Sequence, residues 1–147
     1  MKTVRVVAVV GAVLALAAFR PFFGAHSLGK PSPERVQRMA TERVNDYLDD
    51  LDATPEQRKA VHVMKDDALK EGRVLHEDNT KAREELLVQW DSPKMDSGRV
   101  HALVDARVDA MRAFAHKLAD NAVELHTLLT PEQRGKVSEH IKERSRW

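Results

Sequence analysis

From Ser32 onward the apolar residues recur every three or four positions, and no segment alternates in the manner of a β-strand. This period predicts an all-α fold. Helix-start signals divide the chain into four helices, which begin at Ser32-Pro33, at Thr54, at Asp96 or Ser97, and at Thr130. The second helix ends at Asp91-Ser92-Pro93, because proline cannot continue it.

Each helix carries one apolar stripe that we expect to be buried. The stripes consist of Val36, Ala40, Val44, Tyr47 and Leu51 on the first helix, Val61, Met64, Ala68, Leu75, Ala82, Leu86 and Trp90 on the second, Val100, Val104, Val108, Met111, Ala115, Leu118, Ala122, Leu125 and Leu129 on the third, and Val137 and Ile141 on the last.

The lengths of the two central helices indicate the shape. At ~1.5 Å per residue they span about 55 and 50 Å, whereas a compact body of ~120 residues has a diameter near 35 Å. We therefore expect an elongated antiparallel hairpin with short flanking helices. A hairpin has few layers in which to bury broad apolar stripes, so we also expect a homodimer. A monomeric three- or four-helix bundle is the alternative.

Composition excludes several classes of function. The chain has no cysteine, so disulfides, thiolate metal sites and cysteine nucleophiles are excluded. Residues 1–27 carry three bases and no acid, which leaves 21 bases and 23 acids in the rest of the chain. Interspersed charges without a basic field argue against nucleic-acid binding. The sequence has no phosphate loop, HExxH or GxSxG motif, so we expect neither an enzyme nor a bound cofactor.

The N-terminus predicts export. Lys2 and Arg5 precede an apolar run of 14 residues, Val6–Phe19, which is too short for a typical membrane-spanning helix but fits a secretory signal. We interpret residues 1–27 as a signal peptide cleaved after about Ser27, or as an uncleaved inner-membrane anchor. Residues 28–32 form a linker, and residues 33–145 form the helical domain.

A short motif occurs twice, as Thr54-Pro55-Glu56-Gln57-Arg58 and as Thr130-Pro131-Glu132-Gln133-Arg134. Each copy predicts a capping box. The threonine hydroxyl accepts from the backbone N–H three residues later, and the glutamine side chain reaches back to the threonine N–H. Proline occupies the first helical position, where its missing donor costs nothing.

Two such copies, following an export signal and separated by a long helical hairpin, resemble the LTxxQ family of periplasmic proteins, the Spy/CpxP group. Leu129-Thr130-Pro131-Glu132-Gln133 matches the family motif in full, whereas Ala53 replaces the leucine of the first copy and Leu51 is its nearest substitute. The resemblance covers about residues 34–145. It implies a cradle-shaped antiparallel homodimer that acts as an ATP-independent chaperone for unfolded envelope proteins, and it implies a link to envelope-stress signalling through a sensor histidine kinase.

One face of the second helix is a candidate for client binding. Lysines and valines alternate on the side opposite the expected core, at Lys59, Val63, Lys70, Val74, Lys81 and Val88. Exposed valines mixed with positive charge suit an unfolded chain that presents apolar segments and negative charge. The alternatives are an ordinary solvated face with scattered valines, or the dimer interface.

Seven histidines raise a metal-binding alternative, a periplasmic heavy-metal sensor or resistance protein. His62 with Asp66, and His116 with Asp120, each place an imidazole and a carboxylate four residues apart on a helix. Two such pairs could together bind Zn²⁺, Ni²⁺ or Cu²⁺. A histidine and an aspartate at this spacing also form ordinary surface ion pairs, so these four residues are weak candidates.

Overall fold

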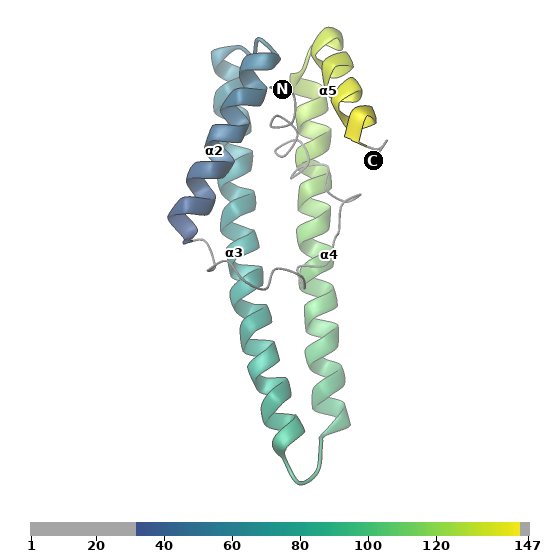
Figure 1. Cartoon of the computed structure of the whole chain (residues 1–147). Helices are drawn as coiled ribbons and strands as arrows, with labels where there is room; N and C mark the ends of the chain where they lie inside the picture. The colour runs from purple at the N-terminus through teal and green to yellow at the C-terminus, as the bar shows by residue number, and fades with distance from the viewer. Residues whose placement is uncertain (1–31, 145–147) are drawn as a thin grey trace. The chain divides into compact units, whose positions relative to one another are not determined.

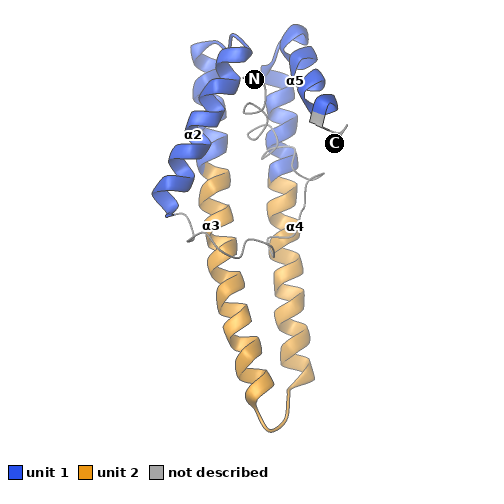
Figure 2. Ribbon diagram, viewed as in Figure 1, with its two compact units in different colours: residues 1–66, 118–147 blue, residues 67–117 orange. Residues whose placement is uncertain are grey.

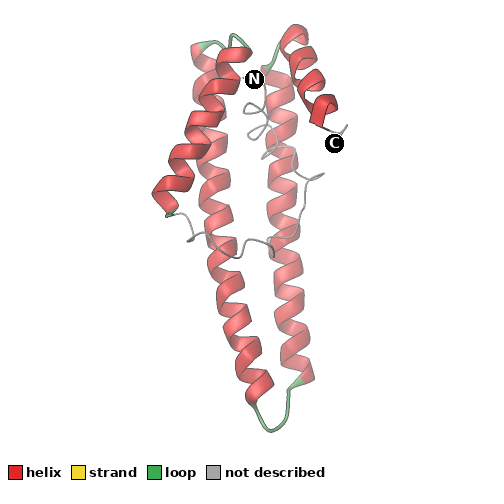
Figure 3. Ribbon diagram, in the orientation of Figure 1, coloured by secondary structure: helices red, strands yellow, loops and turns green. Residues whose placement is uncertain are grey.

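The computed structural model describes residues 32–144, and all regular structure within that range is helical (Figures 1 and 3). The described residues form four helices, α2 (Pro33–Asp50), α3 (Pro55–Asp91), α4 (Ser97–Leu128) and α5 (Pro131–Arg144). The expected all-α class is therefore confirmed, and each helix begins within a residue of its predicted start. The predictions for residues 1–27 and for most of the 28–32 linker lie outside the described residues.

Local capping explains where the helices begin. Ser32 accepts a hydrogen bond from the Arg35 N–H at 3.3 Å and caps α2, with proline in its first turn. Asp96 accepts from the Arg99 N–H at 3.1 Å and caps α4. In both cases one short polar side chain satisfies a backbone donor that the first turn leaves unpaired.

The end of α2 is a Schellman turn with an aspartate in the left-handed position. Asp52 has φ 51°, the Asp52 N–H donates to the Asp49 carbonyl at 3.0 Å, and the Ala53 N–H donates to the Leu48 carbonyl at 2.9 Å. Glycine usually fills this position because a Cβ is unfavourable there. Leu48 and Ala53 also pack together, which is the apolar contact that accompanies such turns.

The chain divides into two compact units, coloured separately in Figure 2. Unit 1 comprises the residues up to Asp66 and from Leu118 onward, and unit 2 comprises Asp67–Lys117. The core of unit 1 has one cluster of Tyr47, Leu51, Leu125 and Leu129 and another of Val44, Leu48 and Ala53, and Val61 packs against both. Most of these residues belong to the predicted stripes, but Leu48, among the most buried side chains, does not.

Unit 2 is built from the second part of α3 and the first part of α4, which lie side by side. Lys117 pairs with Glu71 near one end, and Arg99 Nε pairs with Glu85 Oε1 at 2.5 Å near the other. None of its side chains is fully buried. A seam between two helices covers only one side of each, and here charged side chains occupy part of that seam.

The prediction of buried stripes is therefore wrong at several positions. Leu86, Trp90, Val104 and Val108 in unit 2 are exposed, as are Val36 and Ile141 in unit 1. Helical periodicity identifies the apolar face of a helix, but it does not supply a neighbour to cover that face. The elongated hairpin of the whole chain and its dimer stay predictions. Within residues 32–144, no helix combines the length and the apolar character needed to cross a bilayer.

Candidate functional site

Both copies of the repeated motif form the predicted capping box. The Thr54 N–H donates to Gln57 Oε1 at 2.9 Å, and the Gln57 N–H donates to Thr54 Oγ1 at 3.3 Å. Thr130 and Gln133 make the same two bonds at the same distances. The first turns of α3 and α5 are thus capped identically, as the sequence predicts.

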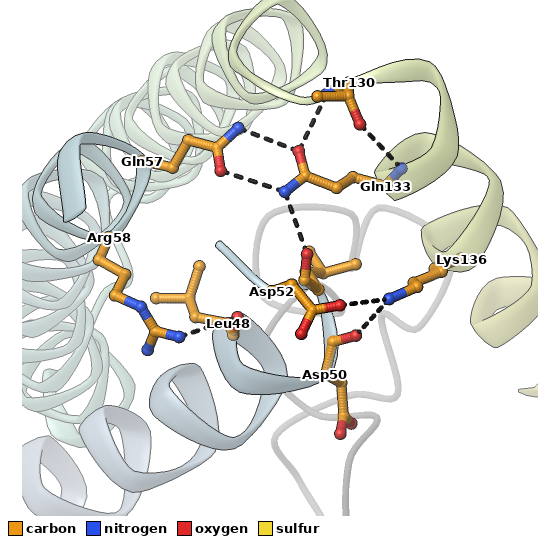
Figure 4. Close-up of polar contacts among 9 residues, drawn as sticks. Leu48, Asp50, Asp52, Gln57, Arg58, Thr130, Gln133 and Lys136 are labelled. Carbon is orange, nitrogen blue, oxygen red and sulfur yellow. Dashed lines mark hydrogen bonds and ion pairs between the residues drawn. The ribbon is translucent and has the colours of Figure 1, made fainter. Parts of the chain in front are cut away.

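The two glutamines also bind each other, which the sequence analysis did not anticipate (Figure 4). Gln57 Nε2 donates to Gln133 Oε1 at 3.0 Å, and Gln133 Nε2 donates to Gln57 Oε1 at 3.1 Å. Each amide uses its remaining hydrogen on a backbone carbonyl near the other motif. Gln57 donates to the Leu128 carbonyl at 2.7 Å, and Gln133 donates to that of Leu51 at 3.0 Å. We call this arrangement the glutamine clasp.

The clasp explains why the motif requires glutamine. Each side chain donates twice and accepts twice, which is the full capacity of a primary amide. Both residues are 8% exposed, so an unpaired group would be costly here. A glutamate could cap its own helix, but as a carboxylate it could not donate to the opposite amide or carbonyl. The clasp therefore joins two helix ends that local capping alone would leave separate.

The arginines that follow the two clasp glutamines donate hydrogen bonds to backbone carbonyls nearby. Arg58 donates from Nε to the Ala53 carbonyl at 3.0 Å and from Nη2 to the Leu48 carbonyl at 3.2 Å, and it pairs with Asp49 at 2.7 Å. These contacts place a cation at the C-terminal end of α2, where the helix dipole is negative. Arg134, its counterpart in the second motif, donates to the His126 carbonyl at 3.1 Å near the end of α4.

Two further side chains of α5 contact the end of α2 and the turn that follows it. Lys136 Nζ donates to the Asp50 carbonyl at 2.9 Å and to Asp52 Oδ2 at 3.0 Å (Figure 4). The His140 ring meets the Tyr47 ring edge-on, with centroids 5.8 Å apart. Burial raises the pKa of Tyr47, and the charge of Asp50 raises it further. The sequence offered no signal for Lys136 or His140, because their partners lie far away in the chain.

All six candidate client-binding residues are exposed. Lys59 and Val63 belong to unit 1, while Lys70, Val74, Lys81 and Val88 belong to unit 2. Of the two candidate lysines in unit 2, Lys81 makes a long ion pair of 3.6 Å with Asp78, which leaves most of its positive charge exposed to solvent. These residues have the solvent access that client binding requires, and their role stays a prediction.

The candidate metal ligands have other partners or stand on the surface. His62 Nε2 lies 2.9 Å from Asn45 Oδ1, and Asp66 accepts from Lys65 at 2.6 Å. His116 and Asp120 are exposed. Within the described part of the chain, no three histidine, aspartate or glutamate side chains gather in a group that could hold a metal ion.

Comparison with protein families identifies a family that is named for the repeated motif. The model of the LTXXQ motif family protein matches residues 39–141, which is most of the chain. The chain belongs to the LTXXQ motif family. Proteins of this family are generally periplasmic. Comparison with the curated proteins and with the solved structures gives no match.

In the first copy of the motif, Leu51 occupies the place in the core that the motif leucine would fill. Leu129, the leucine of the second copy, belongs to the buried cluster with Tyr47 and Leu125. The corresponding Ala53 packs in the other cluster, and Leu51 joins Leu129 instead. The Schellman turn between α2 and α3 makes this exchange feasible, because it places Leu51 beside Leu129 while Ala53 packs against Leu48.

Proposed function

We propose that this protein is an ATP-independent periplasmic chaperone that binds unfolded envelope proteins and suppresses their aggregation. Membership in the LTXXQ motif family supports the cellular setting. The exposed apolar side chains of unit 2 carry the proposal, because a chain that leaves so many of them accessible has surface available for other proteins. A sensor histidine kinase is the regulatory partner that we propose, through the family resemblance.

Mixed valine and lysine side chains suit reversible binding without nucleotide. Full burial of a valine contributes about 1.5 kcal/mol, and binding also costs several kcal/mol of lost freedom. A few valines therefore hold an extended segment only weakly, so release needs no energy input. Lys70 and Lys81 favour clients with negative charge near their apolar segments.

We also propose that a second copy of the chain covers the apolar stripe of α4. Val100, Val104 and Val108 lie within about 80° of one another around the helix at 100° per residue, so a single neighbouring helix could cover them. Val104 and Val108 are both exposed in one chain. A homodimer would supply that neighbour, in line with the antiparallel cradle that the family resemblance implies.

The decisive experiment is a light-scattering assay of a denatured protein diluted into buffer without nucleotide. The variant Val63→Ser/Val74→Ser/Val88→Ser should lose aggregation suppression while its helicity and Tm stay unchanged. The control Val36→Ser/Val123→Ser replaces exposed valines elsewhere and should keep full suppression. Equal suppression by both variants would exclude this face as the client site, and no suppression by the parent protein would refute the chaperone proposal.

Three further measurements separate the alternatives. Sedimentation equilibrium tests the homodimer, and a monomer at all concentrations would contradict it. A rise of several degrees in Tm with Zn²⁺, Ni²⁺ or Cu²⁺, reversed by chelator, would favour the metal-sensor function instead. Co-purification from envelope extracts would identify unfolded clients, a sensor kinase, or neither.

A further inference from the structure

The loop end of unit 2 gathers exposed apolar side chains, of which only Val88 is also a candidate client-binding residue. Leu86, Leu87, Trp90 and Met95 lie within ten residues of one another beside Val88, and we call these five residues the tip patch. Trp90 is 75% exposed, Val88 67% and Leu87 55%. Such a concentration of large exposed apolar groups marks an interaction site.

The part of the tip patch that lies on α3 covers about half of the helix circumference, which is wider than a single apolar stripe. Successive residues of a helix are 100° apart, so Leu86, Leu87 and Val88 together span about 200° of its circumference. A neighbouring helix covers a narrow stripe, as we propose for Val104 and Val108 on α4. A patch that faces several directions is covered instead by a fluid medium that surrounds the tip.

Several backbone groups of the tip are hydrogen-bonded between the loop and the last turn of α3, which lowers the cost of entering a less polar medium. The Asp96 N–H donates to Gln89 Oε1 at 3.1 Å, and the Ser92 N–H donates to the Gln89 carbonyl at 3.3 Å. Ser92 Oγ lies 2.6 Å from the same carbonyl and 2.9 Å from that of Lys94. Satisfied backbone groups lower the cost of leaving water.

The charges of the tip indicate which kind of membrane it fits. Residues 83–99 contain three bases and four acids, and Arg99 and Glu85 neutralise each other. A nearly neutral tip gains nothing from an anionic surface, whereas tryptophan and lysine are typical of segments at the level of lipid headgroups. Asp91 and Asp96 flank the apolar residues and limit the depth of insertion.

We propose that the tip patch inserts shallowly into the interfacial region of a zwitterionic lipid bilayer. Trp90 and Leu87 are the main anchors, and Lys94 extends toward the headgroups. Insertion is driven by apolar contact and not by charge, so it depends little on salt or on the anionic lipid content. The same protein would then work at the membrane surface, where envelope proteins emerge unfolded.

Trp90 itself reports on this insertion. The chain has two tryptophans, so Trp147→Phe leaves Trp90 as the single tryptophan fluorophore in the full chain. With phosphatidylcholine vesicles we expect a blue shift of Trp90 emission and stronger quenching by lipids brominated near the headgroup than by lipids brominated deep in the acyl chain. Adding phosphatidylglycerol or raising salt should leave both signals unchanged. The signal comes from the tip alone, so it is informative whether or not the N-terminal segment binds lipid.

A matched pair of variants in the same Trp147→Phe background completes the test. Leu87→Ser should weaken the partitioning of the tip about tenfold, since it removes one large apolar group. Val36→Ser/Val123→Ser should leave it unchanged. The proposal would be overturned if Trp90 were not quenched by the brominated lipids, or if the control variant lost lipid partitioning as much as Leu87→Ser. It would also be overturned if Trp90 became shielded without lipid as the protein concentration rises, because that would indicate a second copy as the occupant. The aggregation assay contains no lipid, so its outcome is independent.

Discussion

Gln57 and Gln133 bind each other side chain to side chain although 76 residues separate them, and each also satisfies a carbonyl beside the other's helix start. This contact gives the first testable prediction. Gln57→Ala and Gln133→Ala should each lower the free energy of unfolding by about 2–3 kcal/mol, because each leaves buried groups unpaired.

The two substitutions should be far from additive. Once one glutamine is gone, the other has already lost its partner, so the double variant should cost much less than the sum. Urea unfolding of the four proteins in this cycle measures the coupling. Gln37→Ala, at an exposed position of α2, is the control and should change stability by less than about 0.5 kcal/mol. Additive effects would mean that the glutamines act only as separate caps.

Substitutions at Leu51 and at Ala53 should both destabilise the protein, the first by emptying one cluster and the second by overfilling the other. Leu51→Ala removes a side chain from the cluster with Leu129 and should cost about 2–5 kcal/mol. Ala53→Leu restores the motif leucine but overfills the cluster of Val44 and Leu48, so it should also destabilise, by about 1–3 kcal/mol. Thermal and urea unfolding measure both. A stabilising Ala53→Leu would show that Leu51 is no substitute.

Asp52 should tolerate glycine better than any branched residue. Its φ of 51° is unfavourable for side chains with a Cβ, so Asp52→Gly should raise stability by about 0.5–1 kcal/mol, whereas Asp52→Val should lower it by about 1–2 kcal/mol. The ion pair of Asp52 with Lys136 is largely exposed and contributes little. Lys136→Met measures that contribution separately, and a loss as large as that of Asp52→Val would contradict the backbone explanation.

Tyr47 should make the protein sensitive to alkali. Burial raises its pKa in the folded state, so its contribution to stability is complete below its unfolded pKa of about 10 and is lost as pH rises toward the folded value. Tyr47 is the chain's one tyrosine, so its ultraviolet titration can be followed directly. We expect ionisation to coincide with unfolding above pH ~10. Ionisation at the ordinary pKa with the helices intact would contradict burial.

A control is needed because another group acts in the same direction. Lys117 donates a hydrogen bond to Glu71, and this bond raises the pKa of Lys117 in the folded state. The stabilisation that the bond gives is therefore also lost as pH rises through the folded-state pKa of Lys117. Tyr47→Phe should flatten the alkaline decline, and Lys117→Met should leave the tyrosine titration unchanged. Urea midpoints measured from pH 7 to 11 separate the two.

The helix boundaries were predictable because their causes are local. Ser32, Thr54, Asp96 and Thr130 each cap a backbone donor only a few residues away, so a short stretch of sequence contains both partners. The position of Leu51 as a substitute could also be anticipated from its proximity to Ala53. These features require no knowledge of the tertiary structure.

The clasp and the exposed stripes could not be predicted for a common reason. The sequence predicts Gln57 to be a capping residue. Nothing near Gln57 in the sequence indicates that its side-chain amide will also exchange two hydrogen bonds with that of Gln133. Trp90 lies on an apolar stripe, but its burial depends on a neighbour that the stripe does not specify. Contacts between distant residues decided both outcomes.

The clasp also sets an order of assembly during synthesis. The first motif precedes unit 2 in the chain and the second follows it, so unit 1 cannot close until unit 2 and the second motif have both been synthesised. Closing a loop of 76 residues carries an entropic cost that a nascent fragment cannot recover. The growing chain therefore leaves unit 1 open until the second motif is available.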